Sequence, residues 1–201
     1  MTQFFKKVLT PIQNIFSKLP LWAHGLFALF SFSLVGGANA ILERSYAASQ
    51  FPVPFAVGQT SFSGETLKGY YSYMIEKDTL GIYWQTQFID FLFIGAIFLA
   101  GLVVSLLFAR LDRGKAFLYG IALAAAIILP LGAIFDASEN LLSFFMLSQP
   151  VSFPNWLALV YSSFAVLKFS AIGLGMLLWL VSLVGFFFGQ VFKVFRPSIR
   201  A

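Results

Sequence analysis

The sequence predicts an all-α fold, an antiparallel bundle of four transmembrane helices with an N-terminal amphipathic segment at the membrane interface and a short outer amphipathic helix. Three observations predict it. Hydrophobic residues make up 59% of the 201 residues and charged residues only 10%, whereas soluble domains carry about 25% charge. The apolar residues fall in four stretches, each long enough to cross a bilayer as a helix of about 20 residues. The basic residues lie mostly at one end of these stretches. A soluble globular protein and a disordered chain are both excluded.

Residues 1–20 are predicted to form a cytoplasmic amphipathic segment at the membrane interface. Apolar residues recur every three or four positions and share one helical face, namely Phe5, Leu9, Ile12, Phe16 and Leu19. Thr10, Pro11 and Gln13 resemble a helix start with its N-cap and capping glutamine, which predicts two short helices broken at Thr10. The segment either anchors the chain on the membrane surface or packs along the cytoplasmic ends of the bundle.

Residues 21–201 are predicted to form a single membrane domain. The spans are expected at about 21–41, 83–109, 116–147 and 156–192, with an outer loop at 42–82. An alternative for the first span is a secretory signal peptide, because Lys6 to Lys18 precede an apolar stretch that ends in the small residues Ala38-Asn39-Ala40. We expect a retained helix, since the segment before it is long and has amphipathic structure of its own.

The Lys and Arg positions predict that both termini are cytoplasmic. Nine basic residues fall on one side of the four spans, namely Lys6, Lys7, Lys18, Arg110, Arg113, Lys115, Lys193, Arg196 and Arg200. The other side has Arg44, Lys68 and Lys77, which four acidic residues balance. This bias explains the pI of about 9.6 without a nucleic-acid partner, and no Lys/Arg run or aromatic RNA-binding motif is present.

The outer loop divides into two halves. Its first half contains Pro52, Pro54 and Gly58 and is not expected to form a regular helix. Ser63-Gly64-Glu65 resembles a helix start, and an amphipathic helix is predicted over about 64–77, resting on the outer membrane surface or on the bundle. The aromatic residues around it predict an interfacial belt, namely Tyr70, Tyr71, Tyr73, Tyr83 and Trp84. An aromatic cage or a lid over a ligand is the alternative.

Four ionisable residues lie inside the predicted spans, where a charge is costly and suggests a function. They are Asp90, Asp136, Glu139 and Lys168. If the second and third spans reverse near residue 112 and the last two near 151, Asp90 and Lys168 both lie level with about residue 135. Asp90 precedes Arg110 by 20 residues, about 30 Å along a helix. The sequence therefore predicts a polar layer just inside the outer boundary of the hydrocarbon region.

Further polar residues join this predicted layer. Asp136, Glu139 and Asn140 share one helical face, Tyr161 lies on the face of Lys168, and Gln87 precedes Asp90 by one turn. Three acids and one base would leave two excess negative charges, so we expect at least one carboxyl group to hold a proton. Either Lys168 is a counter-ion that lets the helices assemble, or the surplus carboxylates bind a proton, a cation or a cationic head group.

Small residues at a spacing of four predict close helix packing, either within the chain or in an oligomer. The pairs are Gly185 with Gly189, Ala96 with Ala100, and Gly120 with Ala124. No metal site, cofactor or catalytic group is predicted. His24 is the only histidine, cysteine is absent, and no Gly-rich loop followed by lysine is present. An enzyme that modifies lipids through the carboxylates is the least favoured class.

The order of these motifs resembles an uncharacterised group of small bacterial four-helix membrane proteins. The resemblance covers about residues 65–175 and lies in Phe88-Ile89-Asp90, in the segment from Phe135 to Asn140, and in Lys168. It implies the topology and a bacterial inner membrane, but no activity. The long outer loop also resembles the layout of claudin-type tetraspans, without their tryptophan and cysteine signature.

The sequence thus favours a non-enzymatic membrane subunit or a scaffold that binds a partner or a lipid. Its partners would be the lipid bilayer, other membrane subunits or a second copy of the chain. The alternative is a small carrier or channel coupled to protons or cations through the four buried charges.

Overall fold

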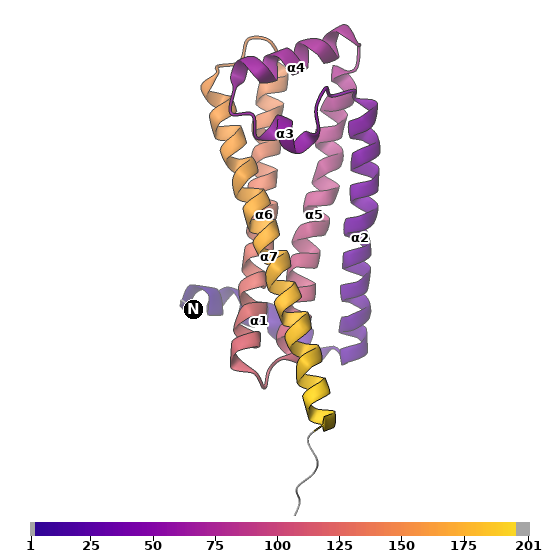
Figure 1. The fold of residues 1–201 in the computed structure, drawn as a ribbon, viewed down its shortest axis with the longest axis vertical. Helices are drawn as coiled ribbons and strands as arrows, with labels where there is room; N and C mark the ends of the chain where they lie inside the picture. Colours follow the sequence, from indigo (N-terminus) through magenta and orange to yellow (C-terminus); the bar gives the residue numbers. More distant parts are fainter. Residues whose placement is uncertain (1–2, 196–201) are drawn as a thin grey trace, which may run out of the picture.

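The structure, a computed structural model, describes residues 3–195, which form seven α-helices and contain no strand (Figure 1). The helices are α1 (Gln3–Lys18), α2 (Leu21–Ala48), α3 (Phe55–Gln59), α4 (Gly64–Glu76), α5 (Leu80–Leu111), α6 (Ala116–Ser148) and α7 (Trp156–Phe195). Four of them, α2, α5, α6 and α7, are long and apolar enough to cross a membrane. The chain is therefore an all-helical protein with the features of a multi-pass membrane protein. Arg196 and Arg200 lie outside the described residues, as do the side chains of Phe5, Lys6 and Lys193.

The long helices pack in the order α2, α5, α6, α7, each mainly against its neighbours in this row. Glycines let the inner helices approach closely. A Cβ atom at Gly101 of α5 would lie 2.7 Å from the Cβ of Leu129, and one at Gly132 of α6 would lie 2.9 Å from Ile172. The two edge helices, α2 and α7, have no extensive contact with each other. The row of helices is therefore open between its first and last members.

Helix α1 is continuous through Pro11, so the predicted break at Thr10 is wrong. Proline removes one helical hydrogen bond, but tertiary packing holds the two halves in line. Leu9 is buried against Leu106, Ala109 and Ala122, and Ile12 and Phe16 pack against the same cluster. Of the two predicted roles, packing against the bundle is the one this face of α1 fulfils.

Helix α2 is longer than the predicted first span. It continues from residue 41 to Ala48, so Ala38-Asn39-Ala40 lies within a helix and the predicted loop over 42–82 is wrong for 42–48. The next segment is also more regular than predicted, because Phe55–Gln59 forms a short helix that begins directly after Pro54. A proline before the first turn suits a helix start, since the first amides of a helix have no intrahelical partner.

Helix α4 occupies the predicted range and lies across the ends of α5, α6 and α7 (Figure 1). Ser63 caps it, and its Oγ accepts a hydrogen bond of 3.2 Å from the Thr66 amide. The predicted aromatic belt is wrong for two of its members. Tyr71 and Tyr83 are 0% and 3% exposed and pack with Met146 and other residues of the bundle ends. Of the two positions predicted for this helix, the outer membrane surface or the bundle, its buried face contacts the bundle.

The three small-residue pairs differ in what they face. Gly185 faces the side chain of Leu118 and Gly189 that of Lys115, so this pair serves packing of α7 against the start of α6. Ala96 and Ala100 are both buried. Gly120 has no atom within 4 Å of the position of a Cβ, and Ala124 is only partly buried. The third pair therefore does not mark a close helix contact within the described chain.

Candidate functional site

Three of the four predicted intramembrane charges form one buried cluster. The Lys168 ammonium of α7 donates to Asp136 Oδ1 at 2.7 Å and lies 2.6 Å from Glu139 Oε2. Asp136 and Glu139 lie three residues apart on α6, so both carboxylates face the same ammonium. The three side chains are 5%, 5% and 0% exposed. Two carboxylates therefore share one cation, and all three side chains are almost fully buried.

Asp90, the fourth charge, has a neutral partner. Asn140 Nδ2 donates to Asp90 Oδ2 at 2.9 Å and also lies 3.4 Å from the carbonyl oxygen of Gln87. No Lys, Arg or His nitrogen of the described residues lies within 4.0 Å of the Asp90 carboxylate. Asp90 is only 7% exposed. It is thus a buried acid with no cation of its own.

The polar layer contains buried acceptors that have no hydrogen-bond partner. Tyr161 is buried next to Glu139, as the shared depth predicted. Within the described residues, Oε1 of Glu139, Oε1 of Gln87 and Oδ1 of Asn140 have no hydrogen-bond partner. Buried polar atoms are almost always hydrogen-bonded. Such a layer is suited to take up a proton or a ligand that carries donors.

A cavity of about 370 Å³ lies between α2, α5 and α7, next to α3. The charged residues at its wall are Asp90, Asp136, Lys168 and Glu43, and the polar ones are Asn39, Gln59, Thr86 and Gln87. The remaining lining is apolar or aromatic, and consists of Leu42, Tyr46, Ala47, Pro54, Phe55, Phe93, Phe169 and Ile172. Mostly apolar walls with a few placed polar groups are typical of small-molecule sites.

Aromatic contacts lie on both sides of this cavity along the bundle axis. On the α4 side, Phe55 of α3 lies 5.9 Å from Tyr46 and 6.3 Å from Phe169 between ring centroids. Toward α1, Trp179 of α7 donates its indole N–H to Ser105 Oγ at 2.7 Å and lies 6.4 Å from the Phe32 ring. Glu43, Ala47 and Phe55 of the lining are exposed. The cavity therefore reaches the surface beside α2 and α3.

Sequence reasoning missed the cavity, although it found the charges at its wall. One signal was available in the sequence, because Asn39 and Glu43 are polar residues four positions apart near the end of an apolar stretch. In the structure, Asn39 Nδ2 donates to Glu43 Oε1 at 3.1 Å. Other signals were not available. The space exists because α2 and α7 pack on different partners, which no local pattern encodes.

Comparison with known proteins finds no matching family model, no matching curated protein and no matching solved structure. Among residues 3–195, no three His, Asp or Glu side chains are arranged to hold a metal ion. The polar layer and the cavity beside it are thus the features of the described chain that bear on its function.

Proposed function

We propose that this protein is a non-enzymatic membrane scaffold that binds one amphiphile with a cationic head group in the cavity between α2 and α7. The observation that carries the proposal is the position of Asp90. It is a buried acid without a cationic partner on the wall of a mostly apolar cavity.

The proposal places the four long helices across a bilayer as an antiparallel bundle. Large apolar side chains on the edge helices support this, because Trp22 of α2 and Phe187 of α7 are 70% and 59% exposed. The end that carries α1 would be cytoplasmic, since Lys7, Lys18, Arg110, Arg113 and Lys115 gather there. The cavity then lies in the outer half of the membrane, where a lipid tail can enter between α2 and α7.

The charges favour a cationic head group over an anionic one. Lys168 is already held by two carboxylates, so its ammonium is not free for an anion. Asp90 and Glu43 are the acids left at the cavity without a described cation. An ammonium group beside Asp90 would form a charge-assisted hydrogen bond and would offset the excess of acid in the layer. The apolar walls would hold its hydrocarbon chain.

The Lys168 cluster has a structural part in this proposal. It joins α6 to α7 at the depth of the cavity, and its rigidity fixes the wall against which the ligand packs. Such a cluster is costly to break, because removal of one partner leaves an uncompensated buried charge.

A carrier coupled to protons or cations is the second candidate, and the surplus of carboxylates favours it. It requires a route from the polar layer toward the α1 end. Trp179, Ser105 and Phe32 do not line the cavity but contact one another farther toward that end. Ion flux through liposomes that contain the protein tests this candidate directly, and flux that Asp90→Asn abolishes would replace the scaffold proposal.

The test of the scaffold proposal is binding of three amphiphiles that share one alkyl chain, an alkylammonium, an alkyl sulfate and an alkyl alcohol. We expect the purified full chain to bind the alkylammonium most tightly. Asp90→Asn should weaken that binding by about tenfold, because one hydrogen bond to a charged group is lost. Asparagine keeps the size of the side chain and an oxygen that Asn140 can contact.

Glu76→Gln is the matched control, since Glu76 is an exposed acid outside the cavity, and it should leave the affinity unchanged. Ala47→Trp, which fills the cavity from α2, should weaken all three amphiphiles. Equal affinity for the alkylammonium and the alkyl sulfate, or equal loss in Asp90→Asn and Glu76→Gln, would refute the proposal.

A further inference from the structure

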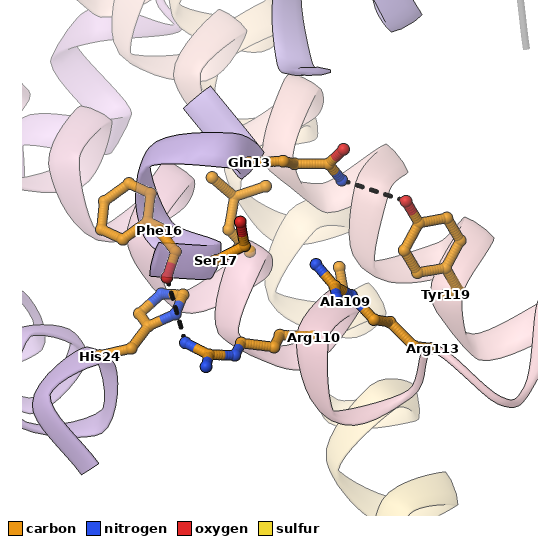
Figure 2. Close-up of a pocket in the computed structure, with 9 residues that line it drawn as sticks. Gln13, Phe16, Ser17, His24, Ala109, Arg110, Arg113 and Tyr119 are labelled. Carbon is orange, nitrogen blue, oxygen red and sulfur yellow. Dashed lines mark hydrogen bonds between the residues drawn. The ribbon is translucent and has the colours of Figure 1, made fainter. Parts of the chain in front are cut away.

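A second pocket lies at the opposite end of the bundle, where α1 crosses the start of α2 and the end of α5 (Figure 2). Its polar lining consists of Gln13, Ser17, His24, Arg110, Arg113 and Tyr119. Its volume is about 20 Å³, which is room for about one water molecule. A larger group would have to sit at its mouth.

The pocket has two guanidinium groups and no acid. Arg110 of α5 donates from Nη1 to the carbonyl oxygen of Phe16 at 3.1 Å, which uses one of its five N–H donors. Neither Arg110 nor Arg113 has a carboxylate within 4.0 Å among the described residues. The nearby acid, Asp112, is buried and pairs with Lys115 at 3.3 Å. Donors and positive charge are therefore available to an anion.

Tyr119 adds a neutral donor. Gln13 Nε2 donates to the Tyr119 hydroxyl oxygen at 3.3 Å, as Figure 2 shows. Because the hydroxyl oxygen accepts that bond, the O–H of Tyr119 remains free to donate. The lining of the pocket thus contains two guanidinium groups and one phenol.

His24 gives the pocket a further polar atom, a buried acceptor without a partner among the described residues. Its ring is fully buried, stacks on Phe16 at a centroid distance of 4.7 Å, and places Nε2 3.1 Å from the Val103 carbonyl oxygen. A carbonyl only accepts, so Nε2 carries the hydrogen and Nδ1 of the neutral ring is an acceptor. Nδ1 has no partner among the described residues. A water in the small volume would donate one hydrogen to Nδ1 and the other to an anion at the mouth.

We propose that Arg110, Arg113 and Tyr119 bind a phosphate group at the mouth of this pocket. Guanidinium groups match the oxygens of phosphate in geometry as well as in charge. The surroundings favour a lipid as its source, because apolar side chains of α1 and the start of α2 are exposed beside the pocket, including Ile15 at 64% and Trp22 at 70%. Acyl chains would cover these side chains while the phosphate lies on the arginines.

The experiment uses the full chain in nanodiscs of phosphatidylcholine with a minor fraction of phosphatidylglycerol that has the same acyl chains. Native mass spectrometry after release from the nanodiscs should find one retained anionic lipid per chain. Arg113→Gln should lower this retention about tenfold, the loss expected for one charge-assisted interaction. The Arg113 guanidinium makes no described hydrogen bond, so this variant should fold normally.

Lys18→Gln is the matched control, because Lys18 is an exposed base at the same end that does not line the pocket. Equal losses in Arg113→Gln and Lys18→Gln, or equal retention of phosphatidylglycerol and phosphatidylcholine, would overturn the proposal. A second arm titrates inorganic phosphate into detergent-solubilised protein. Phosphate binding that Arg113→Gln abolishes, without lipid retention, would support the phosphate site and assign it to a free phosphate. Alkylammonium binding at Asp90 should be unaffected in all these variants.

Discussion

Two lysine clusters in this protein have similar chemistry but different surroundings. Lys168 lies 2.7 Å from Asp136 and 2.6 Å from Glu139, and all three side chains are almost fully buried. Lys68 of α4 lies 3.3 Å from Glu65 and 2.7 Å from Asn155 Oδ1, and the Glu65 side chain is 74% exposed. Water can replace the partners of the exposed cluster but not those of the buried one. Burial of the cluster, more than the distance between the charged atoms, should therefore decide how much each lysine contributes to the free energy of unfolding.

The largest expected effect is that of Lys168→Met. Methionine leaves Asp136 and Glu139 buried without a cation, and we expect the free energy of unfolding to fall by about 3–5 kcal/mol. Unfolding by denaturant in mixed micelles measures this. The double variant with Asp136→Asn should recover part of the loss, because one buried charge is removed. A double variant no more stable than Lys168→Met would contradict the pairing.

Lys68→Met should have a much smaller effect. Exposed ion pairs contribute little, since solvent screens them and the side chains lose freedom when they pair. We expect an unfolding midpoint that cannot be distinguished from that of the unchanged protein under the same conditions. A loss of stability as large as that of Lys168→Met would contradict this expectation and show that the stability of the fold depends on the attachment of α4.

The smallest expected effect is a pH dependence at the exposed cluster. The hydrogen bond from Asn155 and then the nearby Lys68 hold the pKa of Glu65 below its usual range. A lowered folded-state pKa stabilises the fold above the unfolded-state value of about 4.3, and this contribution is lost as the pH falls through the folded-state pKa. NMR signals of the Asn155 side-chain amide should shift in that acidic range and stay constant in Glu65→Gln.

Prediction from sequence succeeded where a property is local or follows from helix geometry. The four spans needed only apolar length, and α4 needed only its spacing and the Ser63 cap. The meeting of Asp136, Glu139 and Lys168 followed from counting residues back from a short turn. The position of Asp90 was predicted less accurately. It was expected level with about residue 135, but its partner Asn140 lies more than one helical turn beyond that level.

Prediction failed where packing overrides a local signal. Thr10 and Pro11 resemble a helix start, but burial of Leu9 keeps α1 continuous. Tyr71 and Tyr83 resemble membrane-interface residues, but they lie in the core at the α4 end of the bundle. His24 is a polar residue close to the start of a span, but it is fully buried and stacks on Phe16.

The sequence by itself determined that this is a multi-pass helical membrane protein and which of its few charges lie at one depth, because both depend on helical rise and on the cost of charge in hydrocarbon. Only the tertiary structure decided that Asp90 faces a cavity and that Arg110 and Arg113 face a second pocket. The cavity and the second pocket both form where helices do not pack closely against one another. The spacing of residues along the chain does not determine which helices lack such close packing.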